Sequence, residues 1–205
     1  ASLEGDLSGR YYDYRVEVFA PGTGLVRNRV TDPYSLSLNA DSRRSVVVRL
    51  DSPALKPPGW DGHARPAALA SSTDMVVYEL HVRDFSIGDL TVPAPERGKY
   101  LAFTEGGSDG MKHLKALAAA GLTDVHLLPS FDLASVPEKG CVTPNPSGAP
   151  DSPDQQATVA ATAGTDCFNW GYDPYHFNAP EGSYASDAMG AERRVLELRQ
   201  TVLGL

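Results

Sequence analysis

The feature that most constrains the fold is the stretch 76–86 (VVYELHVRDFS), where β-branched and aromatic residues alternate with charged ones. A period of two over such a stretch predicts a β-strand with one apolar face and one polar face. The apolar face would carry Val76, Tyr78, Leu80 and Val82, and the polar face would carry Glu79, His81 and Arg83.

A helix and a second strand follow this stretch. Residues 108–121 predict a helix with Ser108 or Asp109 as its N-cap and Gly121 as its stop, and residues 124–131 predict the strand. A strand–helix–strand unit makes its two strands parallel. In a (β/α)8 barrel the polar face of the first strand would look inward, with its charges near the mouth.

The same residues carry a resemblance to a known family. Residues 78–86, 98–103, 113–118 and 126–129 are similar to the start of the catalytic barrel of pullulanases and limit dextrinases. These are starch-debranching members of the α-amylase superfamily, glycoside hydrolase family 13. The resemblance runs from about Tyr11 to the end and implies that the second part of the chain is α/β, the first part of a (β/α)8 barrel.

Length and charge limit the further interpretation. A (β/α)8 barrel usually needs about 250 residues, and the chain has 205 in total, so we expect an incomplete barrel within a longer polypeptide. A net charge of -8 argues against nucleic acid and anionic membranes as partners. The resemblance implies a neutral α-glucan instead, such as pullulan, amylopectin or a limit dextrin.

The N-terminal part predicts strands at residues 9–19, 25–30 and 45–50, without a helix. We expect the end of a β-sandwich, because residues 30–35 and 45–48 resemble the end of a carbohydrate-binding module 48. Tyr11, Tyr12 and Tyr14 could stack on sugars, but tyrosines at strand spacing more often belong to the core or to the sheet surface. The predicted domains are residues 1–52 for the sandwich, 53–73 for a proline-rich linker and 74–205 for the barrel. Trp60 would hold the two domains together.

Two cysteines flank an insert of low complexity. Cys141 and Cys167 are either free thiols or a disulfide that closes the loop. Residues 144–163 contain no aromatic residue, so we expect this segment to be disordered or the most mobile part of the chain.

Residues 167–184 hold six aromatic residues among glycines and prolines, which predicts neither a helix nor an ordinary strand. Aromatic rings beside polar groups suit sugar binding. By resemblance, Tyr172 is the aromatic platform beneath the glucose at the cleavage site, and Trp170, Asn169 and Asp173 shape the loop around it. Residues 191–205 predict a last helix, with Val195, Leu198, Val202 and Leu205 along one apolar stripe.

Glycosidic bonds are cut by a pair of carboxylates. The resemblance places these groups beyond Leu205, so we assign no catalytic residue here, and Glu79, Asp84 and Asp173 match no catalytic motif. We expect His81 and His126 to be hydrogen-bonded inside the barrel rather than to bind metal. No cofactor is identified; calcium sites occur in this superfamily, but the resemblance places none on this chain.

The sequence thus predicts part of an enzyme that cleaves α-1,6-glucosidic bonds, with substrate-binding groups but no catalytic ones, so that the 205-residue chain alone would be inactive. Two alternatives remain: an isoamylase or branching enzyme of the same superfamily, and a truncated, non-catalytic carbohydrate-binding or regulatory protein. The resemblance suits a plastid stroma as well as secretion or a bacterial periplasm.

Overall fold

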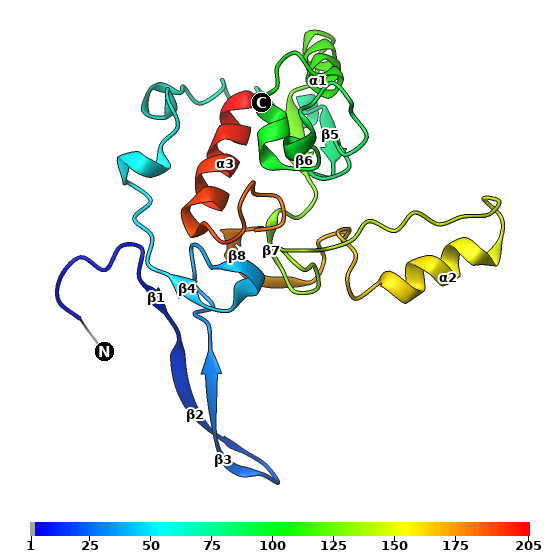
Figure 1. The fold of residues 1–205 in the computed structure, drawn as a ribbon. Helices are drawn as coiled ribbons and strands as arrows, with labels where there is room; N and C mark the ends of the chain where they lie inside the picture. The colour runs from blue at the N-terminus through cyan, green and yellow to red at the C-terminus, as the bar shows by residue number, and fades with distance from the viewer. Residues whose placement is uncertain (1–2) are drawn as a thin grey trace.

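The computed structural model describes residues 3–205, and a β-hairpin and a helical arm project from its body (Figure 1). None of the helices described in it is long and apolar enough to cross a membrane. The strands are β1 (Tyr11–Tyr12), β2 (Tyr14–Ala20), β3 (Gly24–Val30), β4 (Ser45–Val46), β5 (Val77–Leu80), β6 (Asp124–Leu127), β7 (Phe131–Leu133) and β8 (Pro174–Pro180). The α-helices are α1 (Asp109–Ala119), α2 (Pro153–Thr162) and α3 (Ala191–Gly204).

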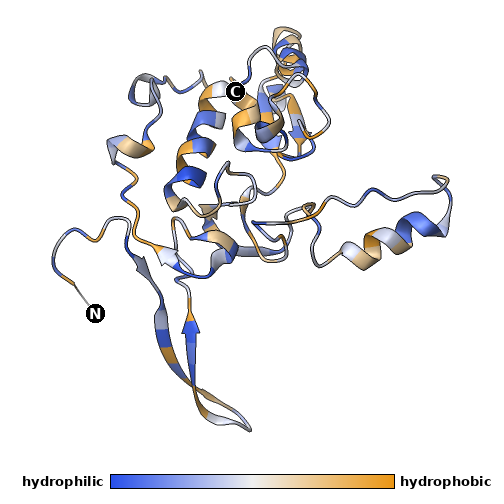
Figure 2. Cartoon of the chain, in the orientation of Figure 1, coloured by the Kyte–Doolittle hydropathy of each residue, from blue (hydrophilic) through white to orange (hydrophobic). Residues whose placement is uncertain are grey.

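The N-terminal hairpin consists of β2 and β3, which pair antiparallel from Tyr14↔Val30 to Ala20↔Gly24. Hydrophobic and hydrophilic residues alternate along it, as Figure 2 shows, and the two predicted strands are confirmed. The third predicted strand is shorter than expected, because residues 45–50 contribute only β4, which pairs with β1.

The predicted strand–helix–strand unit is present. Strands β5 and β6 are parallel, with register from Val77↔Asp124 to Leu80↔Leu127, and α1 connects them. The Ser108 hydroxyl caps α1 by accepting a 3.2 Å hydrogen bond from the Met111 amide. Gly121 follows the helix with φ of 112°, a conformation that a side chain disfavours.

Both strands of this unit are shorter than the sequence pattern predicted. Strand β5 ends at Leu80, and the chain then turns, with the Phe85 amide bonded to the His81 carbonyl at 2.9 Å. The predicted strand 124–131 divides into β6 and β7. Pro129 lies between them and has no N–H with which to continue the ladder.

The apolar face of β5 packs as expected. Tyr78, Leu80 and Val82 contribute to a hydrophobic cluster beneath α1, although Val76 is half exposed. The buried members of this core are Leu80, Val82, Tyr100, Phe103, Met111, Leu114, Tyr184 and Ala185.

Helix α3 confirms half of the predicted apolar stripe. Val195 is buried and Leu198 packs against the hydrophobic cluster, but Val202 and Leu205 are 46% and 49% exposed. A polar row is buried instead, at the helical spacing that places residues on one face: Arg194, Glu197 and Thr201. Asp132 and Glu138 bond Arg194, Ser186 bonds Glu197, and the Tyr100 carbonyl accepts from Thr201, although Arg194 Nε has no partner among the described residues. These partners are distant in sequence, so sequence hydrophobicity alone does not reveal the row.

The linker is fastened to α3 by Arg199. Its guanidinium lies 4.9 Å from the centre of the Trp60 ring, and it donates hydrogen bonds to the carbonyls of Leu50 (2.9 Å) and Leu55 (2.8 Å). Trp60 therefore contacts the second part of the chain, as a residue joining two regions would.

In the insert, one of the two alternatives for the cysteines is observed, and the prediction for the segment between them is wrong in part. Cys141 and Cys167 form a disulfide with Cα atoms 4.9 Å apart. Within the segment expected to be disordered, α2 forms, with Pro153 in its first turn and no buried residue. The sequence of α2 explains why the prediction was wrong here. Its alanines and glutamines favour a helix and Pro153 suits a first turn, so this helix can form without burying aromatic residues.

Candidate functional site

The carboxyl ends of β5 and β6 are crossed by residues 168–173, a segment we term the aromatic loop. His81 Nε2, just beyond β5, lies 2.7 Å from the Asn169 carbonyl oxygen. Beyond β6, a β-carbon on Gly171 would lie 2.9 Å from both Cβ and the carbonyl oxygen of Pro129. The loop thus lies at the end of the parallel strands where active sites are found in α/β folds.

A single serine holds the two ends of the aromatic loop together. Asn169 Nδ2 donates a 2.6 Å hydrogen bond to Ser135 Oγ, and that hydroxyl donates to Asp173 Oδ2. Asn169 Oδ1 also accepts a 2.7 Å bond from the Gly171 amide, and the Ala134 amide donates to the Asp173 carbonyl at 3.0 Å. Asn169 and Asp173 consequently fix the shape of the loop through hydrogen bonds.

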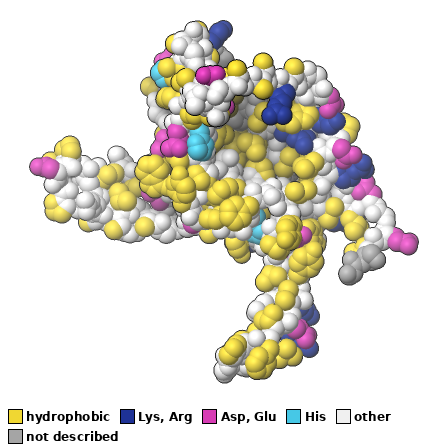
Figure 3. All heavy atoms as spheres, turned by 180° about the vertical axis from the view of Figure 1, so that it is seen from behind, with side chains coloured by type: hydrophobic (Ala, Val, Ile, Leu, Met, Phe, Trp, Pro, Cys, Tyr) yellow, Lys and Arg dark blue, Asp and Glu magenta, His cyan; other side chains and the backbone are white. Residues whose placement is uncertain are grey.

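The two remaining predicted residues present aromatic rings to solvent. Trp170 is 62% exposed and Tyr172 is 70% exposed. Trp170 packs edge-on against Phe168 at 5.6 Å between ring centres, and Phe168 packs on buried His81 at 5.3 Å. Hydrophobic side chains gather on the side of the molecule where the α2 arm leaves the body (Figure 3). Exposed rings on a hydrogen-bonded loop can stack on the apolar faces of sugars.

The aromatic loop leads directly into β8, which corrects the expectation that residues 167–184 form no ordinary strand. β8 pairs antiparallel with β7, but the register shifts on both sides of Asp132. The regular alternation of side chains is lost at these shifts. The first and last residues of β8 are Pro174 and Pro180, and prolines in a sequence argue against a strand.

The charged residues near the strand ends form no catalytic pair. Asp84 forms an ion pair with Arg83 at 3.0 Å. Glu79 lies 3.6 Å from His126, and both side chains are more than half exposed. The prediction that His81 is hydrogen-bonded in the interior is confirmed, whereas His126 points to solvent in this structure.

A buried charged network lies beneath the loop and was not anticipated from the sequence. Arg194 is fully buried and bonds both Glu138 (2.8 Å) and Asp132 (3.3 Å). Asp132 also bonds His176 Nδ1 at 2.7 Å, and Glu181 accepts the Leu133 amide at 2.7 Å. Burial first, and then the neighbouring Glu138 carboxylate, raise the pKa of Glu181 to about 7.

This network supplies no catalytic pair. Asp132, Glu138 and Glu181 place carboxylate oxygens within 4.8 Å of one another, which is close enough to share a cation. The guanidinium of Arg194 pairs with Asp132 and Glu138 and offsets one of their negative charges, and all three carboxylates are shielded from solvent. Because of this burial they cannot contact a glycosidic bond.

Several of these residues have weak sequence signals. Ser135 lies in an exposed loop far from the aromatic loop in sequence, and no local pattern joins the two. The buried row of α3 has a weak sequence signal for burial. Arg194 and Glu197 are three positions apart, which places them on one helix face, and the apolar Val195 follows Arg194.

The chain is similar to known pullulanases in sequence and in structure. The chain is 44% identical, over its entire length, to the chloroplastic pullulanase 1 of Arabidopsis thaliana, and it spans 22% of that protein. A crystal structure of Klebsiella pneumoniae pullulanase complexed with maltotriose superposes with a TM-score of 0.87 and 38% identity, covering 96% of this chain and 22% of that one. The chain is homologous to pullulanases.

This homology confirms the resemblance inferred from the sequence, and the fold superposes on one region of the Klebsiella pneumoniae pullulanase. An isoamylase from a Flavobacterium species is 33% identical, but only over 56% of the chain and 11% of that protein. A comparison with models of protein families gives no match. The chain spans about a fifth of the length of the pullulanases it matches.

Proposed function

We propose that this chain supplies substrate-binding parts of a starch-debranching glycoside hydrolase. The whole enzyme would cleave α-1,6-glucosidic bonds of pullulan, amylopectin or limit dextrins by a retaining, double-displacement mechanism. The catalytic carboxylates would come from outside these 205 residues, so the chain alone would be inactive.

The fold supports this proposal in detail. Residues 74–205 would begin a (β/α)8 barrel, of which β5, α1 and β6 form the first unit with the expected parallel register. Residues 1–52 would end a β-sandwich of the carbohydrate-binding module 48 type, with 53–73 as the linker. The β2–β3 hairpin and the contact of Trp60 with α3 agree with this division.

The observation that carries the proposal is the exposed Tyr172 ring on a loop anchored across the carboxyl ends of two parallel strands. In this role Tyr172 would support the glucose unit at the cleaved bond. Trp170 would border the same surface, and Asn169 and Asp173 would hold the loop in position. The maltotriose complex of the Klebsiella enzyme supports an α-glucan as the ligand.

The proposal is tested by expressing the full-length protein and assaying release of reducing ends from pullulan. A nuclear magnetic resonance measurement of the first product should show an α-configured hemiacetal, because two successive displacements retain configuration. Inversion, or an absence of hydrolysis by folded protein, would contradict the proposal.

An isoamylase or branching enzyme is the first alternative, and it would prefer branched glucan to pullulan or transfer chains rather than hydrolyse them. The pullulanase match along the whole chain, against a partial isoamylase match, favours the debranching enzyme of pullulanase type. A truncated binding protein is the second alternative, and it would bind maltotriose without any turnover.

A further inference from the structure

Two adjoining cavities lie beside the aromatic loop, and they share Asp41, Ser42 and Tyr175 in their walls. The smaller, of about 440 Å³, is bordered by Ser135, the serine that ties the aromatic loop together. The larger, of about 800 Å³, continues to the base of the N-terminal hairpin. Together they form a groove, hereafter the Tyr175 groove, that leads away from the aromatic loop.

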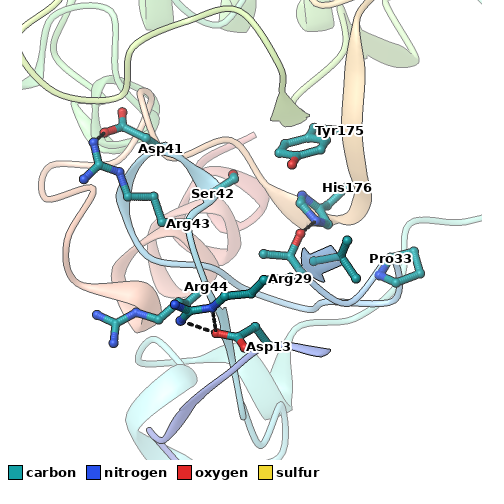
Figure 4. A pocket seen from close by; sticks show the side chains of 11 residues that line it. Asp13, Arg29, Pro33, Asp41, Ser42, Arg43, Arg44, Tyr175 and His176 are labelled. Carbon is teal, nitrogen blue, oxygen red and sulfur yellow. Dashed lines mark hydrogen bonds and ion pairs between the residues drawn. The ribbon is translucent and has the colours of Figure 1, made fainter. Parts of the chain in front are cut away.

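Tyr175 is held at the junction of the two cavities by the residue that follows it. His176 is buried and fixed on both ring nitrogens, at 2.7 Å from Asp132 and 2.7 Å from the Thr31 hydroxyl. Because neighbouring side chains of a strand point to opposite faces, this anchorage turns Tyr175 outward, and it is 54% exposed. Figure 4 shows its ring on one side of the larger cavity, across from Arg29, Arg44 and Asp13.

The opposite wall is polar, and two of its three arginines are paired with carboxylates, while the Arg44 guanidinium lies 4.7 Å from the centre of the Tyr11 ring. Arg29 Nε donates a 2.7 Å hydrogen bond to Asp13, and Arg43 lies 3.4 Å from Asp41. Paired charges attract an anion weakly, whereas guanidinium and carboxylate groups still offer donors and acceptors to hydroxyl groups. An aromatic ring facing such a wall suits a neutral, polyhydroxylated ligand.

We infer that the Tyr175 groove binds a stretch of α-glucan chain distant from the cleaved bond, with Tyr175 as its platform and Arg43 and Asp41 as hydrogen-bonding groups. This inference rests on the proposed function and extends it to the length of the substrate chain. A glucan long enough to pass Ser135 would occupy both the aromatic loop and the groove, while a short oligosaccharide would occupy only the loop. The enzyme would accordingly favour long chains.

The test is isothermal titration calorimetry of the full-length protein with maltoheptaose and with maltotriose, linear ligands that contain no α-1,6 bond. Tyr175→Ala should weaken maltoheptaose binding about 5- to 20-fold, because a stacked ring loses its apolar contact. The loss for maltotriose should be less than about twofold, and Tyr175→Phe should stay close to wild type for both ligands.

Phe177→Ala is the matched control, since Phe177 is exposed on the same strand but lines neither cavity. It should change maltoheptaose affinity by less than about twofold. If Tyr175→Ala fails to fold, as judged by its melting curve, Arg43→Ala on the opposite wall should still reduce maltoheptaose affinity about threefold or more.

Two results would contradict glucan binding in the Tyr175 groove. One is wild-type affinity for maltoheptaose in a folded Tyr175→Ala protein, and the other is an equal loss of affinity in Phe177→Ala. Failure of the proposed function gives a different result: wild-type protein would then bind neither oligosaccharide, or would bind maltotriose without hydrolysing pullulan. Retained maltotriose binding with no effect at Tyr175 would remove the groove alone.

Discussion

Arg194 and Glu138 form a 2.8 Å ion pair between two side chains that are both shielded from solvent. Asp132 completes the arrangement on the other guanidinium nitrogen. Arg194 belongs to α3, Asp132 to β7 and Glu138 to the segment that follows β7, while the Asp41 amide bonds Glu138 from the N-terminal region at 2.8 Å. The pair therefore joins segments that are far apart in sequence.

Arg194→Met should destabilise the protein by about 3–5 kcal/mol, because it leaves buried carboxylates without their cation. The measurement is urea or thermal unfolding of the full-length protein near neutral pH. Arg193→Met is the control, since Arg193 is the exposed neighbour on the same helix, and it should shift stability by no more than about 0.5 kcal/mol. Equal effects of the two substitutions would contradict a structural role for the ion pair.

The raised pKa of Glu181 makes the free energy of unfolding depend on pH, and it decides the direction of that dependence. Its pKa rises from 4.5 in the unfolded chain to about 7 in the folded one, so the folded state retains the proton more strongly. The resulting stabilisation is complete below about pH 4.5 and is lost as the pH rises through 7, roughly 3 kcal/mol in all. Glu181→Gln removes the titrating group.

The measurement compares the unfolding free energies of wild type and Glu181→Gln at pH 5 and at pH 7.5. Wild type should lose stability relative to the variant between these two values. Parallel pH profiles would show that Glu181 titrates normally.

Tyr172→Ala should lower kcat/KM for pullulan about 10- to 150-fold in the full-length enzyme, provided that the ring contact persists in the transition state. The exposed ring contributes little to the core, so the melting temperature should change little. Tyr172→Phe should cost much less because it keeps the ring. Unchanged kcat/KM in a folded Tyr172→Ala enzyme would make the loop a structural element only.

Gly171→Ala tests whether the position of the aromatic loop matters. Gly171 has φ of 90°, and a β-carbon there would lie 2.9 Å from Pro129. The loop must move away from the strand ends, so we expect kcat/KM on pullulan to fall by at least about tenfold. Gly107→Ala is the control, because a β-carbon there meets no atom within 4 Å; similar losses in both variants would argue against the loop as the cause.

The disulfide should protect the arm that carries α2. Replacing Cys141 and Cys167 by serine removes a constraint worth about 3 kcal/mol on the closed loop. Since α2 buries no residue, the loss should appear locally, as faster proteolytic cleavage between residues 142 and 166. Mass spectrometry of timed digests measures this rate, with cleavage at the turn 21–24 as the internal control; equal rates at the arm with and without the disulfide would contradict it.

The parts of the fold that were predictable from sequence are those with a local cause. Ser108 as N-cap, Gly121 as stop and the period-two stretch 76–80 each act through neighbouring residues, and each is observed. The lengths of β5 and β6 were overestimated because a strand continues only where its partner does. Pro129 ends β6, the partner of β5. It lies 49 positions after Leu80 in the sequence, so no local pattern shows its effect on the length of β5.

The aromatic loop was recognisable because its rings and its family motif are contiguous, but the interactions that hold it were not. Ser135 and His81 reach it from distant segments, through a hydroxyl and an imidazole with no periodic pattern. The buried network of Arg194 was hidden for the same reason, since charged residues normally indicate a solvent-facing helix side. Only the folded chain brings the compensating charges together.

The disulfide determines how insertions and deletions between Cys141 and Cys167 affect the rest of the fold. Because the Cα atoms of Cys141 and Cys167 are 4.9 Å apart, the intervening segment departs from and returns to almost the same point. Residues added to or deleted from the arm consequently impose no displacement on Phe168 or on the strand that follows. The arm is a place where the chain can lengthen, shorten or carry a reporter group while the rest of the polypeptide keeps its course.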